Sequence, residues 1–366
     1  MMPDPEIKRL LTLDGGGIRG VFSLQILARI EAQLRVKTGN PKLVLADHFH
    51  YLAGTSTGAI IATCLSWGMS VAEVQDLYMN RAVEMFRLSP IYVRFWHKFE
   101  GAALTRMFKV ILSEDGEGKV PALLSTPRLR TLLMLVMRNQ STGSPWPVSN
   151  NPAATFNDPA SPECNLHLPL WQLVRASTAA PVYFPPETIV LGGRKQVFVD
   201  GGITPYNNPA LLLFMMATLP AYNLGWPTGV DKMLLVSVGT GRVRTGSGER
   251  RADQMSMLFY ASSVPGALMD SISLQQDMIC RTIGLCKEGS PIDSEVGDLC
   301  AVPASEIPHR KFTYLRYDHA FTPEEVAQTK QYGKGGISLD NLRLIPFLKE
   351  VGARYAEERV RATDLI

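Results

Sequence analysis

No stretch of this chain is apolar for long enough to cross a membrane as a helix. The longest apolar run covers residues 210–219, about half of the ~20 residues that a spanning helix needs. Charge is also sparse, because only 19% of the residues are charged and the formal net charge is +3. The basic residues are scattered, so the sequence does not indicate a nucleic acid partner. Since 46% of the 366 residues are hydrophobic, we expect a soluble or peripheral globular protein.

Cysteine is scarce and shows no paired spacing. The five cysteines are odd in number and none forms a C-x-x-C pair, which favours reduced thiols in a reducing compartment. The first residues hold neither a cationic stretch nor an apolar run, so we do not expect secretion. The chain has no H-E-x-x-H motif and no clustered spacing of metal ligands. We therefore expect no metal and no cofactor.

The most informative residues that are present form a G-x-S-x-G pentapeptide, residues 54–58. A strand-like run over residues 48–53 precedes it, and a helix-like apolar run over residues 59–65 follows it. This order is typical of a nucleophile elbow, in which a tight turn exposes the serine hydroxyl. Ser56 is therefore the candidate nucleophile, and Gly54 and Gly58 are the residues that let strand and helix pack closely.

A glycine-rich loop, residues 14–20, follows an earlier apolar strand and precedes a helix. Its G-x-G-x-x-G spacing matches a dinucleotide-binding fingerprint, which also needs an acidic residue at the end of the second strand. Asp47 precedes its strand instead. A purely structural turn is a second interpretation, and an oxyanion hole at a helix N-terminus is a third. In the third, Arg19 would orient the loop or neutralise a phosphate head group, and the donors would be the backbone amides of Gly15, Gly16 and Gly17.

Apolar strands alternate with helical patterns along the chain, which predicts an α/β fold with a mostly parallel central sheet. Two later strands, over residues 197–199 and 233–238, also end at glycine. Ligands bind outside the carboxyl ends of the strands in such sheets, where we expect the elbow and the glycine loops to lie. We expect a catalytic core over residues 1–245. Residues 246–366 are expected to form a mainly helical C-terminal extension that packs on the core within one continuous domain.

Two interpretations of the catalytic base remain. An α/β-hydrolase triad has the chain order Ser, Asp, His, which Asp200 followed by His309 or His319 would satisfy. Such folds place several strands before the elbow, whereas here only one strand precedes it. In the second interpretation, Asp200 acts alone. It ends an apolar strand, two glycines follow it, and partial burial would raise its pKa and strengthen it as a base.

These motifs together resemble those of the patatin-like phospholipase family. Supporting blocks are RASTAAPVYFPP at residues 175–186, NNP at 207–209 and SVGTG at 237–241, and the resemblance runs from about residue 8 to residue 242. It implies a three-layer α/β/α fold and a serine–aspartate dyad. Ser56 would attack an ester carbonyl, Asp200 would take its proton, and the glycine amides would hold the oxyanion. The implied activity is that of a lipid acyl hydrolase of the phospholipase A or lysophospholipase type.

The resemblance also implies partners. A phospholipase must reach a bilayer, and residues 85–87 and 91–99 mix aromatic and cationic side chains as interfacial contacts do. Inward packing of these aromatics in an ordinary helix is the alternative. Some bacterial members are antiphage effectors that a cyclic dinucleotide such as cyclic GMP–AMP activates, and the length and the C-terminal region suit that subgroup. We expect a cytoplasmic protein, peripherally membrane-associated when active, and a homo-oligomer. A nucleotide-dependent oxidoreductase and a storage protein with a degenerate site are the interpretations from other classes.

Overall fold

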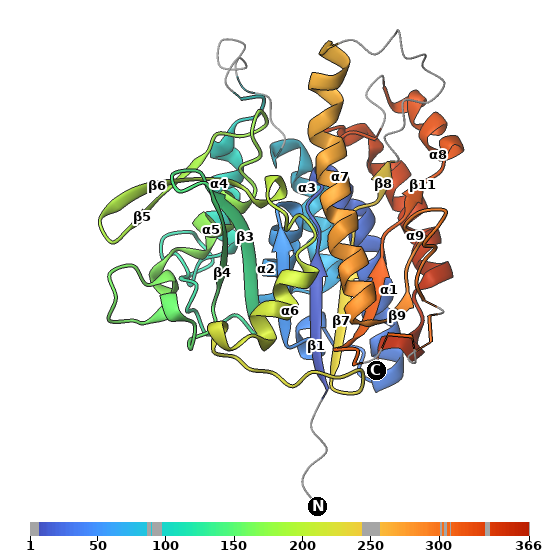
Figure 1. Ribbon diagram of the computed structural model, residues 1–366. Helices are drawn as coiled ribbons and strands as arrows, with labels where there is room; N and C mark the ends of the chain where they lie inside the picture. Colours follow the sequence, from blue (N-terminus) through green and yellow to red (C-terminus); the bar gives the residue numbers. More distant parts are fainter. Residues whose placement is uncertain are drawn as a thin grey trace, which may run out of the picture.

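A mostly parallel sheet runs through the molecule with helices on both of its faces (Figure 1). The computed structural model describes residues 7–85, 89, 97–243, 257–300, 302–303, 306–307, 309–333 and 337–365. Within these ranges nine strands form the sheet, in the order β5-β6-β3-β2-β1-β7-β10-β9, with β4 paired to β3. The strands are β1 (Lys8–Leu13), β2 (Tyr51–Thr55), β3 (Leu132–Asn139), β4 (Ser144–Ser149), β5 (Glu187–Leu191), β6 (Arg194–Asp200), β7 (Met233–Val238), β9 (Leu285–Glu288) and β10 (Thr313–Tyr317). A separate two-stranded ribbon pairs β8 (Arg242–Val243) with β11 (Ala320–Phe321).

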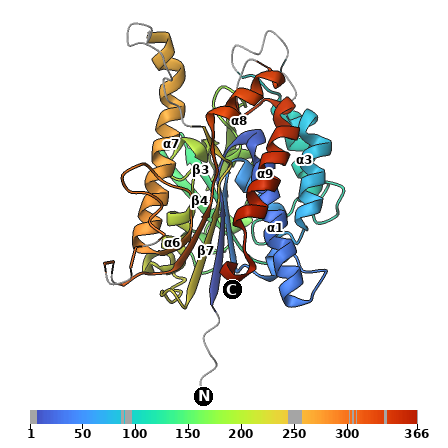
Figure 2. The same cartoon turned by 90° about the vertical axis from the view of Figure 1, so that its right-hand side faces the viewer.

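Two layers of helices cover the sheet. Figure 2 shows α6 and α7 against one face and α1, α3 and α9 against the other. The central strands are apolar almost throughout and buried, as strands covered on both faces must be. The predicted α/β class with a mostly parallel central sheet is thus confirmed. The helices are α1 (Gly20–Thr38), α2 (Thr57–Ser66), α3 (Val71–Met85), α4 (Gly101–Ile111), α5 (Leu170–Ser177), α6 (Ala210–Thr218), α7 (Met257–Ile283), α8 (Pro323–Gln328) and α9 (Ile345–Arg359).

The sheet continues into the C-terminal region. β10 lies between β7 and β9 and is parallel to both, so residues beyond 245 complete the sheet that the earlier residues begin. For this reason we propose one continuous domain without a boundary at residue 245. Within the described residues, no helix combines the length and the apolar character that crossing a membrane requires.

The register along β3 positions the site. β4 occupies one side of β3, and β2 and β6 lie end to end along the other. Thr55, the last residue of β2, pairs with Val136, and Asp200, the last residue of β6, pairs with Met137. β2 is parallel to β3 and β6 is antiparallel, so the carboxyl ends of β2 and β6 face each other. The sequence predicted Asp200 at this edge of the sheet, but it did not predict that β6 runs antiparallel to β3.

Candidate active site

Ser56 occupies a sharp turn between β2 and α2. Its backbone has φ 55° and ψ −123°, a left-handed conformation that a residue with a side chain rarely adopts. A Cβ atom on Gly54 would lie 2.1 Å from the Gly58 carbonyl oxygen, and one on Gly58 would lie 2.2 Å from the Leu13 carbonyl oxygen. Both positions therefore require glycine, and the segment has the strand–turn–helix geometry expected of a nucleophile elbow.

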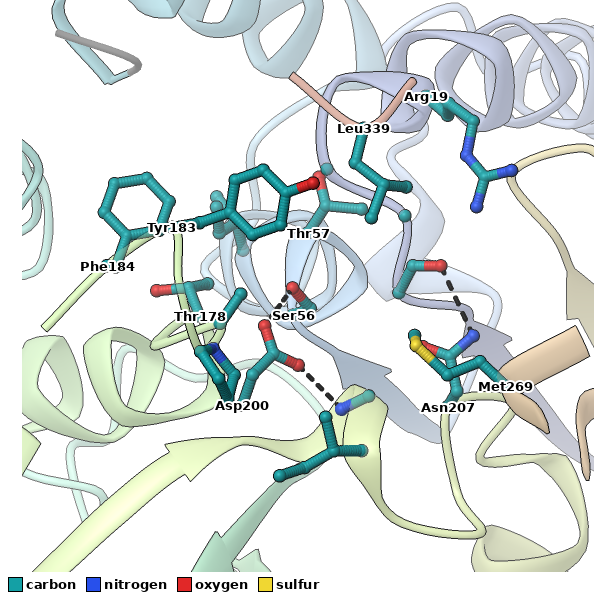
Figure 3. A pocket seen from close by; sticks show the side chains of 18 of the residues that line it. Arg19, Ser56, Thr57, Thr178, Tyr183, Phe184, Asp200, Asn207, Met269 and Leu339 are labelled. Atoms are coloured by element: carbon teal, nitrogen blue, oxygen red, sulfur yellow. Dashed lines mark hydrogen bonds between the residues drawn. The ribbon is translucent and has the colours of Figure 1, made fainter. Parts of the chain in front are cut away.

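Ser56 and Asp200 are in direct contact (Figure 3). The Ser56 hydroxyl donates a hydrogen bond of 2.6 Å to Oδ2 of Asp200, and the other carboxylate oxygen accepts one of 2.6 Å from the Gly202 N–H. Asp200 is only 4% exposed. Burial raises the pKa of Asp200 to about 6, although these two hydrogen bonds and the charge of Arg175 oppose the increase. A carboxylate of this pKa is ionised at neutral pH and is a stronger base than an exposed one.

Ser177, at the end of α5, holds the backbone of the nucleophile. Its hydroxyl accepts a hydrogen bond of 3.0 Å from the Ser56 N–H and donates one of 2.6 Å to the Val136 carbonyl oxygen. Because its proton is used at Val136, this hydroxyl presents only lone pairs to Ser56. The sequence interpretation assigned Ser177 no role, although it lies in the RASTAAP block that supports the family resemblance.

The glycine-rich loop lies beside this pair but offers fewer free donors than predicted. The Gly15 N–H donates to the Asn207 carbonyl oxygen at 3.2 Å, so this contact does not support the predicted role of Gly15 as an oxyanion donor, which stays a prediction. Among the described residues, the N–H groups of Gly16 and Gly17 have no hydrogen-bond partner. Gly17 has φ 57°, and a Cβ atom there would lie 2.3 Å from the Leu339 carbonyl oxygen.

A buried ion network fixes the start of the loop. The guanidinium of Arg316, on β10, donates two hydrogen bonds to the Asp14 carboxylate, at 3.0 and 2.6 Å. It also donates to Asp318 at 3.1 Å and to the Ser237 hydroxyl at 2.7 Å. Since Arg316 is 2% exposed, this network is shielded from solvent. Strand β10, in the C-terminal region, thereby fixes the glycine-rich loop near the N-terminus.

Arg19 anchors the same loop at its other end. Its Nη1 atom donates to the Gly241 carbonyl oxygen at 3.1 Å. Burial lowers the pKa of Arg19, and the nearby carboxylates, Asp270 first, oppose that decrease. Figure 3 shows the guanidinium directed away from Ser56, at the opposite end of the pocket from Tyr183 and Phe184. The inclusion of Arg19 in the oxyanion hole therefore stays a prediction that this orientation does not support, whereas its predicted role in orienting the loop fits the contact with Gly241.

A largely apolar cavity of about 660 Å³ opens onto Ser56. Its walls come from the elbow, the glycine loop, α3, α4, α7 and the segment that follows α5. The apolar lining side chains include Ile60, Tyr78, Leu104, Pro181, Val182, Tyr183, Phe184, Ile203, Met269 and Leu339. Such a cavity has the size and the surface to hold an acyl chain next to the serine hydroxyl.

The candidate histidines lie elsewhere. The ring of His319 contacts the Glu325 carboxylate at 2.7 Å and stacks on Phe22, and His309 occupies an exposed turn. No histidine among the described residues lines the cavity. Ser56 donates directly to Asp200, which favours the serine–aspartate interpretation over the Ser-Asp-His one.

The geometry also gives little support to the dinucleotide interpretation. The Leu339 carbonyl oxygen accepts the Ile18 N–H at 2.8 Å, which removes one of the amides that a pyrophosphate would need. Asp47 forms an ion pair with Arg130 before β2 begins, and it does not lie at the end of a strand. Within the described residues, no group of three or more histidine, cysteine, aspartate or glutamate side chains could hold a metal ion.

Comparisons with known proteins agree with the motifs. A family model described as patatin-like phospholipase matches residues 11–214. The cGAMP-activated phospholipase of Vibrio cholerae is 31% identical over 214 residues, which are 56% of this chain and 56% of that protein. Patatin-16 of Solanum tuberosum is 28% identical over 256 residues, 64% of this chain and 61% of the relative. The matches thus span little more than half of these relatives. The solved structure of VipD from Legionella pneumophila aligns with a TM-score of 0.40 at 14% identity, over 95% of this chain and 67% of that one.

Proposed function

The chain belongs to the patatin-like phospholipase family, and we propose that it is a serine lipid acyl hydrolase that cleaves fatty-acyl esters of membrane phospholipids. The observation that carries this proposal is the 2.6 Å hydrogen bond from Ser56 to the buried Asp200 carboxylate beside an apolar cavity. The cavity would hold the acyl chain. Arg19, the one arginine among the described residues that line it, lies at the end away from Tyr183 and would meet the phosphate.

The chemistry follows from the positions of these groups. Asp200 takes the Ser56 proton while the serine oxygen forms a bond to the ester carbonyl carbon. The amides of Gly16 and Gly17 donate to the oxyanion of the tetrahedral intermediate, where one such donor contributes ~100- to 1000-fold in rate. The intermediate collapses, and Asp200 gives its proton to the departing alcohol oxygen. A water molecule, deprotonated by Asp200, then attacks the acyl-enzyme and releases the fatty acid.

The mouth of the cavity suits a bilayer surface. Val182 and Ile203, which line the cavity, are 74% and 42% exposed. The backbone N–H of Lys98 donates to the Val182 carbonyl oxygen at 2.8 Å, and the Lys98 ammonium group forms an ion pair with Asp340. Exposed apolar side chains at the mouth of a cavity favour contact with a lipid surface. Of the segments expected to contact lipid, residues 86–87 and 91–96 lie outside the described residues. A cytoplasmic enzyme, bound peripherally when active, is the arrangement that this proposal implies.

The test compares wild type with Ser56→Ala, Asp200→Asn and His309→Ala on phospholipid vesicles and on p-nitrophenyl butyrate. We expect the first two variants to lose at least ~100-fold in rate, because nucleophile and base are removed, and His309→Ala to stay active. Circular dichroism checks that each variant is folded. Full activity of Asp200→Asn, or loss of activity only in His309→Ala, would contradict the dyad.

A cyclic dinucleotide is the regulator that we propose for this enzyme, in antiphage defence and in a homo-oligomeric form. The support is the relative from Vibrio cholerae, which is a cGAMP-activated phospholipase. Fatty-acid release from vesicles, measured with and without 3′,3′-cyclic GMP–AMP and cyclic di-GMP, tests the idea. Stimulation by either ligand supports regulation. Identical rates in all three conditions remove it for these ligands, and the hydrolase proposal is then judged on the basal rate.

A further inference from the structure

Two of the five thiols lie together, far along the chain from the catalytic pair. Cys286 is on β9 and Cys300 is in the connection between β9 and β10. Their sulfur atoms are 3.2 Å apart. Cys286 is 1% exposed, whereas Cys300 is partly exposed. No other pair of cysteines is in hydrogen-bond contact in the described part of the chain, which holds all five.

A fully buried arginine fixes the backbone of the segment between the two cysteines. Arg281, in α7, donates to both oxygens of the Asp277 carboxylate, at 2.9 and 2.6 Å. Its Nη1 atom also donates to the carbonyl oxygens of Ser290 and Asp298, each at 2.8 Å. These two carbonyls belong to the connection that separates the cysteines. Arg281 therefore fixes the connection between the two cysteines, and their sulfur atoms must approach from 3.2 Å to the ~2.0 Å of a disulfide bond.

We propose that Cys286 and Cys300 form a reversible thiol–disulfide site that exchanges with a small disulfide such as glutathione disulfide. The site goes beyond the proposed lipid hydrolysis and does not depend on it. It stays reduced in an ordinary cytoplasmic glutathione pool and becomes oxidised when glutathione disulfide accumulates.

The two thiols have different roles in the exchange. Cys300 is the attacking thiol, because it is the more exposed and its hydrogen bond with Cys286 lowers its pKa. Its thiolate bonds to one sulfur of glutathione disulfide, and one glutathione leaves as a thiolate and takes up a proton. Cys286 then loses its proton and attacks the Cys300 sulfur, which releases the second glutathione. The protein thus gives two electrons to glutathione disulfide and forms one disulfide bond.

The bond would tie an edge of the sheet to the connection that follows it. The disulfide would close a loop between residues 286 and 300. This loop lies next to the C-terminal end of α7, where Arg281 contacts it. Gly266 and Met269 of the same helix line the active-site cavity, and its Ser273 lies 3.4 Å from Asn207. Oxidation should therefore stabilise this side of the molecule while Ser56 and Asp200 stay unchanged.

Peptide mapping tests the site directly. The purified full-length chain is equilibrated in glutathione buffers of graded redox ratio, alkylated with N-ethylmaleimide and digested with trypsin. Lys287 separates the two cysteines, so the disulfide would join peptide 282–287 to peptide 288–310. We expect this linked pair to appear as the buffer becomes more oxidising and to disappear on addition of dithiothreitol. The oxidised chain should also melt about 3 °C or more above the reduced chain, since the disulfide restricts the unfolded state.

Three serine variants assign the roles. Cys286→Ser should accumulate a mixed disulfide of Cys300 with glutathione, because the resolving thiol is gone. Cys300→Ser should leave Cys286 reduced, because Cys286 is buried. Cys280→Ser, at a buried cysteine in α7, is the matched control and should still give the linked peptides. The proposal is overturned if no buffer yields the linked pair, if Cys300→Ser is glutathionylated at Cys286, or if the cysteines join two chains instead. A Ser56→Ala chain should exchange normally, which separates this result from any test of hydrolysis.

Discussion

At the scale of single residues, the proposed chemistry depends on the carboxylate of Asp200, whose pKa is raised by folding. Asp200 ends its strand inside the protein, and burial is the largest influence on its pKa, raising it from 3.8 to about 6. The same burial has a cost in stability, because the folded protein must hold a charge with few polar neighbours. Base strength and stability therefore oppose each other at this residue.

We expect both effects in the pH dependence. Activity should rise as the pH increases through about 6 and level off above it, since the ionised carboxylate is the base. Stability should change in the opposite sense. A pKa raised on folding contributes stability that is full below the unfolded value of 3.8 and is lost as the pH rises through about 6. Asp200→Asn should therefore be more stable than wild type at pH 8, by up to ~3 kcal/mol, and the two should converge near pH 4. Urea unfolding at the two pH values measures this, and equal differences at both would contradict the assigned burial effect.

Ser177 gives a second prediction at this scale. Ser177→Ala would leave the buried Ser56 N–H unpaired and release the strained turn, so we expect kcat to fall about tenfold at nearly constant KM. Thr63→Val is the matched control, because it removes a buried hydroxyl whose hydrogen bond stays within α2. Steady-state hydrolysis of a soluble ester measures both variants. If Thr63→Val lowers kcat as much as Ser177→Ala does, Ser177 has only a structural role.

At the scale of elements, the sequence revealed strands in which an apolar run is followed by a glycine-containing turn. β1, β2, β6 and β7 were predicted on this pattern, although β1 and β6 begin with charged residues. β4 was not predicted, because Pro145 and Pro147 obscure its strand pattern; an edge strand tolerates them since it needs no further partner. β10 carries Arg316 in the middle of an otherwise apolar strand. A buried arginine in this strand is explained by its ion pair with Asp14. Because Asp14 lies 302 residues away in the sequence, no local sequence pattern could predict the pair.

The same contact makes a prediction about β10. Arg316→Met should destabilise the fold by ~3–5 kcal/mol, because the buried Asp14 carboxylate would lose its counter-charge. Adding Asp14→Asn removes that charge and should restore part of the stability. Urea unfolding of the two single variants and the double variant, combined as a double-mutant cycle, gives the coupling. Purely additive losses would mean that the two side chains do not stabilise each other.

At the scale of the whole molecule, the family match ends at residue 214 but the folded unit does not. The proposed nucleophile and the proposed base could both be singled out from the sequence, since each stands at a strand end beside glycine. Ser177, which holds the backbone of Ser56, and Arg316, which holds Asp14, could not be predicted, since their roles arise from how β3 and β10 align with their neighbours. The C-terminal region was expected to be a helical extension that packs on the core, yet it also supplies two strands of the sheet.

Truncation tests this unity. A chain that ends at residue 245 would leave β7 at the edge of the sheet without β10, although every residue of β7 is buried in the full chain. We expect this fragment to aggregate or remain unfolded, because a long apolar edge strand invites association. Solubility and circular dichroism of the fragment provide the measurement. A soluble, cooperatively melting fragment would show that the first part folds alone.

The proposed membrane face also belongs to this scale. Val182→Asp should weaken binding to anionic vesicles several-fold, since it places a charge at the apolar mouth of the cavity. Val36→Asp is the control, because Val36 is 81% exposed in α1 and does not line the cavity. Co-sedimentation with vesicles measures both. Equal binding by the two variants would place the lipid contact elsewhere.

The long sequence separation of the joined parts has a consequence for biosynthesis. The partner of Ser56, Asp200, lies 144 residues further along the chain, and the partner of Asp14, Arg316, lies 302 residues further. While the ribosome is still translating, the emerging polypeptide has its serine but neither its base nor the arginine that fixes the glycine loop. A protein that would degrade the lipids around it thus stays inert until almost all of it has been made.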